Sequence, residues 1–152
     1  MLRVNALPFS PSLSQNNMNQ TEIVIPKGLY SKLLNTCRSE LPYEACGLLA
    51  GTSNQIKSLW PMKNELRSTN RFFVSKYVVE DTMKKINSLK QEIFAIYHTH
   101  PNTAAIPSTI DIMNHHDESV DMVIISFKYH VPMMKWYTID DSSYRERPFL
   151  II

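Results

Sequence analysis

The run Glu92–His100 restricts the fold more than any other segment, because it is the strongest candidate for a strand in the middle of a sheet. It is mostly apolar and ends in His-Thr-His. The loop over residues 101–107 contains two prolines, which cannot both fit inside a sheet, so the strand must end at His100. A central strand needs neighbours on both sides, and the rest of the chain must supply them.

The remaining elements follow from apolar periodicity and turn residues. Helices are expected over residues 27–40, 77–90 (with Val79, Met83, Ile86 and Leu89 on one face) and 108–116. Strands are expected over residues 22–25, 45–51, 55–62, 71–75, 121–127, 133–139 and 147–152. Strands interleaved with helices, with hairpin-length turns between neighbouring strands, indicate the α/β class: a mixed β-sheet with helices packed on it.

The chain divides into two parts by composition. Residues 1–20 are rich in Ser, Asn, Gln and Pro without apolar periodicity, which predicts a disordered N-terminal tail. Residues 21–152 have the length of one domain. Sixteen Lys and Arg against fourteen Asp and Glu give no basic surface for nucleic acid, and no apolar run is long enough for a membrane span. With a poor signal peptide and two cysteines, the expectation is a cytoplasmic protein with free thiols.

The main chemical signal is a set of possible metal ligands around the two-proline loop. His98 and His100 end the strand two residues apart, so their imidazoles project from the same face with Cα atoms about 6.6 Å apart. Asp111 begins the next helix, where the chain has turned back, and can supply a third ligand. Two imidazoles and a carboxylate are typical of a catalytic zinc site that leaves its fourth position to water.

Other interpretations of these residues stay open. Ser108 and Asp111 have the spacing of a capping box at a helix start, which explains both residues without a metal and is also compatible with one. Asp111 and His115 could form a different metal pair, although His115 and His116 are more typical of a solvated helix end. His130 is expected in a turn.

Glu44 is the candidate base that would activate water. A carboxylate that opens an apolar strand either lies at an exposed edge or points into a cleft, and the segment alone favours the exposed edge. Gly47 and Gly51 in this strand indicate close backbone approach. Cys46 is better explained as a small buried thiol than as a nucleophile, and Cys37 as a core residue of the first helix.

Together these segments resemble the JAMM (MPN-plus) zinc metalloprotease family, whose signature is an upstream Glu followed by His-x-His-Pro and then Ser and Asp. The similarity runs from about Ile23 to Ile139 and includes Trp60 to Asn64 and Phe72. It implies a cytidine-deaminase-like MPN/JAMM fold and Zn²⁺ as cofactor. The roles it implies are metal ligation by His98, His100 and Asp111, proton transfer by Glu44, and oxyanion stabilisation by Ser108.

The resemblance also implies the reaction. The compact chain is most similar to small stand-alone bacterial members, so the expected substrate is a peptide or isopeptide bond after the C-terminal Gly-Gly of a ubiquitin-like or sulfur-carrier protein. Nucleic acid and membrane are not expected partners, and the oligomeric state stays open. The alternatives are a non-catalytic MPN-fold module that binds a protein or peptide tail, and a DNA-repair-associated JAMM-like protein, which the near-neutral charge disfavours.

Overall fold

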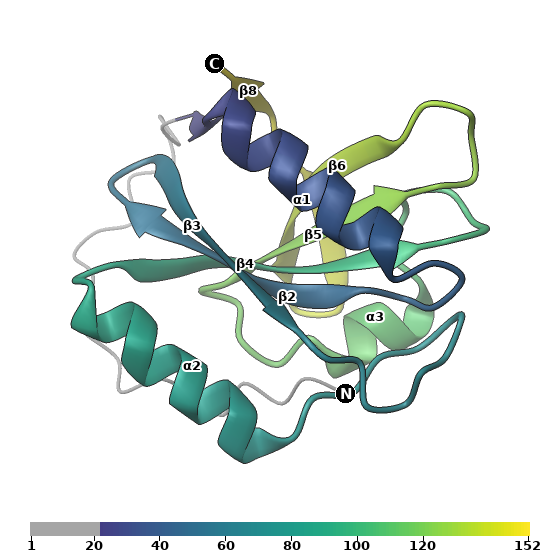
Figure 1. The fold of residues 1–152 in the computed structure, drawn as a ribbon, viewed down its shortest axis with the longest axis horizontal. Coiled ribbons are helices and arrows are strands. Elements are labelled where there is room, and N and C mark those ends of the chain that lie inside the picture. The colour runs from purple at the N-terminus through teal and green to yellow at the C-terminus, as the bar shows by residue number, and fades with distance from the viewer. Residues whose placement is uncertain (1–21) are drawn as a thin grey trace.

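The structure is a computed structural model that describes residues 22–152, so the tail predicted over residues 1–20 lies outside the described residues. The described part is a mixed sheet with helices on both faces, as predicted (Figure 1). The helices are α1 (Lys27–Ser39), α2 (Lys76–Ser88) and α3 (Thr109–Asn114). The strands are β1 (Ile23–Ile25), β2 (Cys46–Thr52), β3 (Gln55–Met62), β4 (Glu92–His100), β5 (Asp121–Ser126), β6 (Met133–Asp140), β7 (Ser143–Glu146) and β8 (Phe149–Ile151).

Strand β4 lies inside the sheet, whose order is β7-β6-β5-β4-β2-β3-β1-β8, so the prediction of a central strand is confirmed. It pairs antiparallel with β2 and parallel with β5. The register places Cys46 opposite His98, which brings the start of β2 next to the end of β4. The two segments with the strongest chemical signals therefore meet at one end of the sheet.

The helices cover opposite faces of the sheet: α1 lies on one face, and α2 and α3 lie on the other (Figure 1). Helix α1 buries Leu33 and Cys37 against the first face, and α2 buries Val79 and Ile86 against the second. Leu89 was expected on the same buried face, which is wrong: α2 ends at Ser88, and Leu89 turns out to solvent. No helix of residues 22–152 is long and apolar enough to cross a membrane.

One of the expected strands is wrong. Residues 71–75 form no strand, because their backbone groups bond to the preceding loop instead of to a sheet neighbour: Phe73 N–H donates to the Asn64 side chain, and Phe73 C=O accepts from Glu65 N–H. The strand expected over residues 147–152 is present as β8. Strand β7, which the sequence did not predict, lies at the opposite edge of the sheet.

Both cysteines lie in the core as free thiols, as the sequence indicates. Burial raises the pKa of Cys37, and that of Cys46, to about 12. The thiolate is the nucleophilic form of cysteine, and these two side chains remain protonated near neutral pH. Cys46 is therefore a structural residue of β2, although it lies two positions from Glu44.

Gly47 and Gly51 allow β2 to approach its neighbours closely, and alanine at either position is expected to destabilise the protein. A Cβ atom on Gly47 would lie 2.6 Å from Tyr97 Cε1, and one on Gly51 would lie 2.9 Å from the carbonyl carbon of Gln55. Overpacking of this kind costs about 1–3 kcal/mol of unfolding free energy, which chemical denaturation would measure.

Gly28 provides the matched control, because a Cβ there meets nothing within 4 Å and the residue lies in α1. Gly28→Ala is expected to stabilise the protein slightly, by about 0.5 kcal/mol. Equal effects of alanine at Gly28 and at Gly47 would contradict the close-approach interpretation.

Candidate metal centre

His98, His100 and Asp111 converge on one point at the end of the central strand. The two-residue period of β4 places both histidines on the face covered by α2 and α3, and the first turn of α3 brings Asp111 over them. The two Nε2 atoms lie 3.2 Å apart, and Asp111 Oδ2 lies 3.2 Å from His98 Nε2 and 3.1 Å from His100 Nε2. Three side chains from one strand and the helix that follows it thus present one donor atom each to a shared space.

Neighbouring groups fix the orientation of these side chains. His100 Nδ1 lies 2.8 Å from the carbonyl oxygen of Ala104 and can donate to it, which turns Nε2 toward Asp111; a metal ion at this place would displace the proton that Nε2 shares with Asp111. The ring of Phe72 stacks on that of His98, with centroids 5.1 Å apart. Ser108 caps α3 through a capping box with Asp111, as one interpretation of the sequence predicts, and the cap holds the carboxylate in place.

Asp111 supplies a negative charge to this cluster. Burial alone would raise the pKa of Asp111, but hydrogen bonds from His100 and His98 hold it well below its usual range. Burial alone would lower the pKa of His100, but its hydrogen bonds to Asp111 and Ala104 raise it overall. Asp111 is therefore an ionised carboxylate in a largely buried place.

The donor set fits zinc. Two imidazole nitrogens and one carboxylate oxygen match the three protein ligands of catalytic zinc sites, and all three atoms lie within 4.8 Å of one another. Among the described residues, the group with this property is His98, His100 and Asp111. His115 lies outside it, so the alternative Asp111–His115 pair has no support in the structure.

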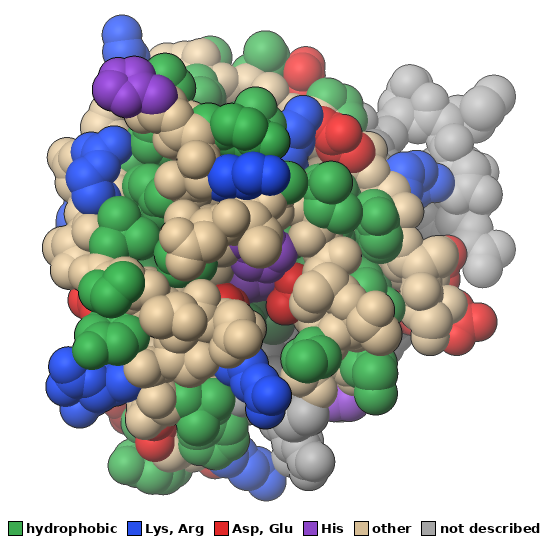
Figure 2. Space-filling view, turned by 90° about the vertical axis from the view of Figure 1, so that its right-hand side faces the viewer, with side chains coloured by type: hydrophobic (Ala, Val, Ile, Leu, Met, Phe, Trp, Pro, Cys, Tyr) green, Lys and Arg blue, Asp and Glu red, His purple; other side chains and the backbone are tan. Residues whose placement is uncertain are grey.

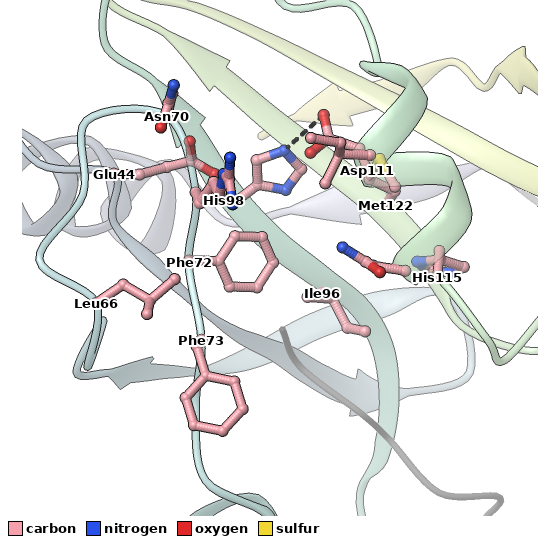
Figure 3. Close-up of a pocket in the computed structure, with 13 residues that line it drawn as sticks. Glu44, Leu66, Asn70, Phe72, Phe73, Ile96, His98, Asp111, His115 and Met122 are labelled. Carbon is pink, nitrogen blue, oxygen red and sulfur yellow. Dashed lines mark ion pairs between the residues drawn. The ribbon is translucent and has the colours of Figure 1, made fainter.

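Glu44 lies beside this cluster, just before β2, and points toward His98 (Figure 3). The expectation of an exposed edge residue is wrong, because Glu44 is only 3% exposed. Its backbone N–H donates to Ser68 C=O at 2.8 Å, so the loop after β3 covers it. Burial raises the pKa of Glu44 to about 7; nearby His98 lowers it in part, and Asp111 raises it further.

Asn64 has a structural role that sequence reasoning missed. Its buried amide Nδ2 donates to the carbonyls of Glu44 and Arg71, at 3.0 and 2.8 Å, and its Oδ1 accepts from the N–H groups of Leu66 and Phe73. This one side chain holds the loop over Glu44 and brings Phe72 to His98. A single Asn in a polar loop gives no local signal of such a role.

A pocket of about 290 Å³ opens beside the cluster, between α3 and the loop over residues 66–73 (Figure 3). Figure 2 shows a hollow on this face with histidine and acidic side chains at its floor. The pocket is lined by Glu44, Leu66, Asn70, Arg71, Phe72, Phe73, Ile96, His98, Ile110, Asp111, Asn114, His115 and Met122. Six of these thirteen residues are apolar, so the cavity joins the polar cluster to an apolar chamber.

The remaining histidines differ from one another. His115 is not a solvated helix end, as was expected, because it is partly buried and its Nε2 lies 2.6 Å from the carbonyl oxygen of Val120. Burial lowers the pKa of His115. His116 is exposed, and His130 is exposed in the turn between β5 and β6, as predicted.

The raised pKa of Glu44 predicts a pH-dependent stability of the metal-free protein. The folded-state pKa of about 7 lies above the ordinary 4.5, so between these values the folded protein retains a proton that the unfolded chain releases. The unfolding free energy should therefore fall as pH rises from about 4.5 to about 7, by roughly 3 kcal/mol at most. Urea unfolding of wild type and Glu44→Gln at several pH values, with chelator present, measures this free energy. The unfolding free energy of the variant should not fall over this pH range. If it fell with pH as steeply as that of wild type, the prediction would be contradicted.

Comparison with known protein families gives a match over most of the chain: the model of prokaryotic homologues of the JAB domain matches residues 26–139. The CysO-cysteine peptidase of Mycobacterium tuberculosis is 26% identical over 133 residues, which cover 86% of this chain and 91% of that protein. The desampylase of Pyrococcus furiosus is 27% identical over 105 residues, which cover 67% of this chain and 72% of that protein.

Solved structures show the same fold. A protein of Desulfitobacterium hafniense superposes with a TM-score of 0.78 and 26% identity, covering 86% of this chain and 92% of that one. A JAB1/MPN domain protein from Archaeoglobus fulgidus superposes with a TM-score of 0.59 and 19% identity, covering 86% of this chain and 100% of that one. The expected fold class is thereby confirmed.

Proposed function

The chain belongs to the family of prokaryotic homologues of the JAB domain, and on this basis we propose that it is a JAMM-type zinc metallopeptidase that cleaves after the C-terminal Gly-Gly of a ubiquitin-like or sulfur-carrier protein. The observation that carries the proposal is the convergence of His98, His100 and Asp111 with a buried carboxylate, Glu44, beside them. A binding module needs no base beside its metal ligands, whereas hydrolysis does, so the position of Glu44 favours the enzyme.

The three ligands would hold Zn²⁺, which when bound makes water acidic near neutral pH and polarises a carbonyl group. Glu44 has a pKa of about 7, so it can accept a proton from water and then pass it to the leaving amine. The hydroxyl of Ser108 accepts from Asp111 N–H, which leaves its own proton free to donate to a developing oxyanion. The amide C–N bond breaks, and the water oxygen joins the new carboxyl group.

The names CysO-cysteine peptidase and desampylase support a ubiquitin-like or sulfur-carrier partner. The chain covers most of both relatives, so the comparison concerns whole domains. The near-neutral charge favours neither nucleic acid nor membrane as partner, and a cytoplasmic location fits the free thiols.

The test is hydrolysis by the zinc-loaded protein of sulfur-carrier and ubiquitin-like proteins that carry an extension after Gly-Gly, linked by a peptide or an isopeptide bond. We expect mass spectrometry to show a product that ends in Gly-Gly. If the protein binds one zinc ion and these carriers but cleaves none of them, it is a binding module and the proposal fails.

A further inference from the structure

Resting on the proposed function, we propose that the pocket beside the metal ligands binds the residue that leaves as the amine, and that this residue is a free C-terminal amino acid with an apolar side chain of about leucine or methionine size. The reaction then removes one residue from a carrier that ends in Gly-Gly-X. Water cleaves the bond between the second Gly and X, leaving the Gly carboxyl group on the carrier and a proton on the amine of X.

The pocket is continuous with the reacting centre. Glu44, His98 and Asp111 form part of its lining, so a group bound there lies next to the proposed scissile bond. Beyond these residues its walls are mainly apolar: Leu66, Phe72 and Phe73 from the loop, Ile96 and Met122 from the sheet, and Ile110 from α3. Such walls stabilise an apolar side chain, and the cationic residue of the lining, Arg71, is the one that we assign to the terminal carboxylate.

The chemistry of Gly-Gly assigns this pocket to the amine side of the bond. The acyl part of the substrate has no side chain at its last two residues, and an apolar pocket at the reacting centre therefore has nothing to bind on that side. The first side chain available to fill it belongs to the residue after the second Gly.

The size of the pocket favours one residue over a continuing chain. Its volume of about 290 Å³ lies just below the usual range for ligand pockets, roughly 300–1,000 Å³. Ile96 and Met122, both buried in strands, close its floor. A lysine side chain in isopeptide linkage would have to continue into a folded acceptor protein in this direction.

Arg71 supplies a partner for the carboxylate of a terminal residue. It lines the pocket and is exposed, and its guanidinium forms no ion pair with another described residue. The side chain of Asn64 holds the Arg71 carbonyl and so fixes the backbone from which this arginine projects. Glu44 and Asp111, the acidic residues of the lining, repel a carboxylate. The terminal carboxylate is therefore expected to bind at the end of the pocket where Arg71 lies.

The test uses one sulfur-carrier protein extended after Gly-Gly by Leu, Met, Ala or Asp. We expect kcat/KM for Leu and Met to exceed that for Ala by at least tenfold, and Asp to be the poorest. Leu66→Ser and Ile110→Ser should each narrow the Leu-to-Ala ratio several-fold, whereas Leu89→Ser, equally exposed but remote from the pocket, should leave it unchanged.

The second arm tests the carboxylate. Amidation of the terminal Leu should reduce kcat/KM about tenfold in wild type and leave it nearly unchanged in Arg71→Ala; Arg71→Lys should restore part of the discrimination, and Arg145→Ala on β7 should behave as wild type. Equal cleavage of Leu and Ala extensions, or a preference for amides or isopeptides, overturns this inference while the proposed function stands. Absence of cleavage of every extension overturns the proposed function itself.

Discussion

Replacing Glu44 by glutamine is expected to reduce kcat for amide hydrolysis by 10²–10⁴-fold while one zinc ion stays bound. Glutamine has nearly the same volume and keeps an oxygen facing His98, but it cannot accept a proton from water, and proton transfer by a placed side chain contributes a factor of this size. Because Glu44 lies outside the group of metal ligands, zinc content measured by mass spectrometry should not change. Activity and metal binding are therefore separable at this one residue.

Glu92→Gln is the matched control, because Glu92 is an exposed carboxylate at the other end of β4. This variant should hydrolyse Gly-Gly-tailed carriers at the wild-type rate. If Glu44→Gln were as active as Glu92→Gln, another group would have to move the proton. Loss of zinc from Glu44→Gln would instead place Glu44 among the metal ligands.

The helices and central strands of this fold can be predicted from the sequence, because their apolar side chains recur with the period of a helix or a strand. Strand β4 has the predicted bounds, and α1 differs from its prediction by one residue. Residues 71–75 show where prediction from periodicity fails. Phe72 to Val74 have side chains typical of a strand, but the backbone of this segment hydrogen-bonds to Asn64 and Glu65 instead of to a neighbouring strand. Side-chain periodicity alone does not reveal which residues will hydrogen-bond to the backbone of a segment.

The convergence of the three proposed metal ligands can also be predicted from the sequence, because residue type and spacing along a strand and a capped helix bring His98, His100 and Asp111 together. The burial of Glu44 could not be predicted in this way, because it depends on a loop that begins twenty residues further along the chain and that the Asn64 side chain holds against Glu44. The raised pKa of Glu44, and thus its fitness as a base, arises from that long-range contact.

Removing one metal ligand is expected to abolish zinc binding and the stabilisation that zinc confers. Wild type should bind one zinc ion per chain, and zinc at 100 times its dissociation constant should stabilise the fold by about 2.7 kcal/mol. His100→Ala should lose well over 100-fold in zinc affinity, a larger loss than the 10–100-fold typical of residues that only orient a ligand. Thermal unfolding with and without zinc, together with titration calorimetry, would measure both effects.

Asp111→Asn separates the loss of a ligand from the loss of a cap. Asparagine keeps the side-chain size, and its oxygen can still accept from Ser108 N–H, so the start of α3 should survive while the charge that favours a cation is gone. We expect this variant to unfold in chelator below the wild-type temperature, because the charged hydrogen bonds of Asp111 with His98 and His100 are lost, and to gain nothing from zinc. His130→Ala, which replaces an exposed histidine in the turn between β5 and β6, should respond to zinc as wild type does.

Zinc stabilisation that survived in both His100→Ala and Asp111→Asn would mean that the metal binds elsewhere in the chain, because neither of the remaining pairs of ligands could hold it with undiminished affinity.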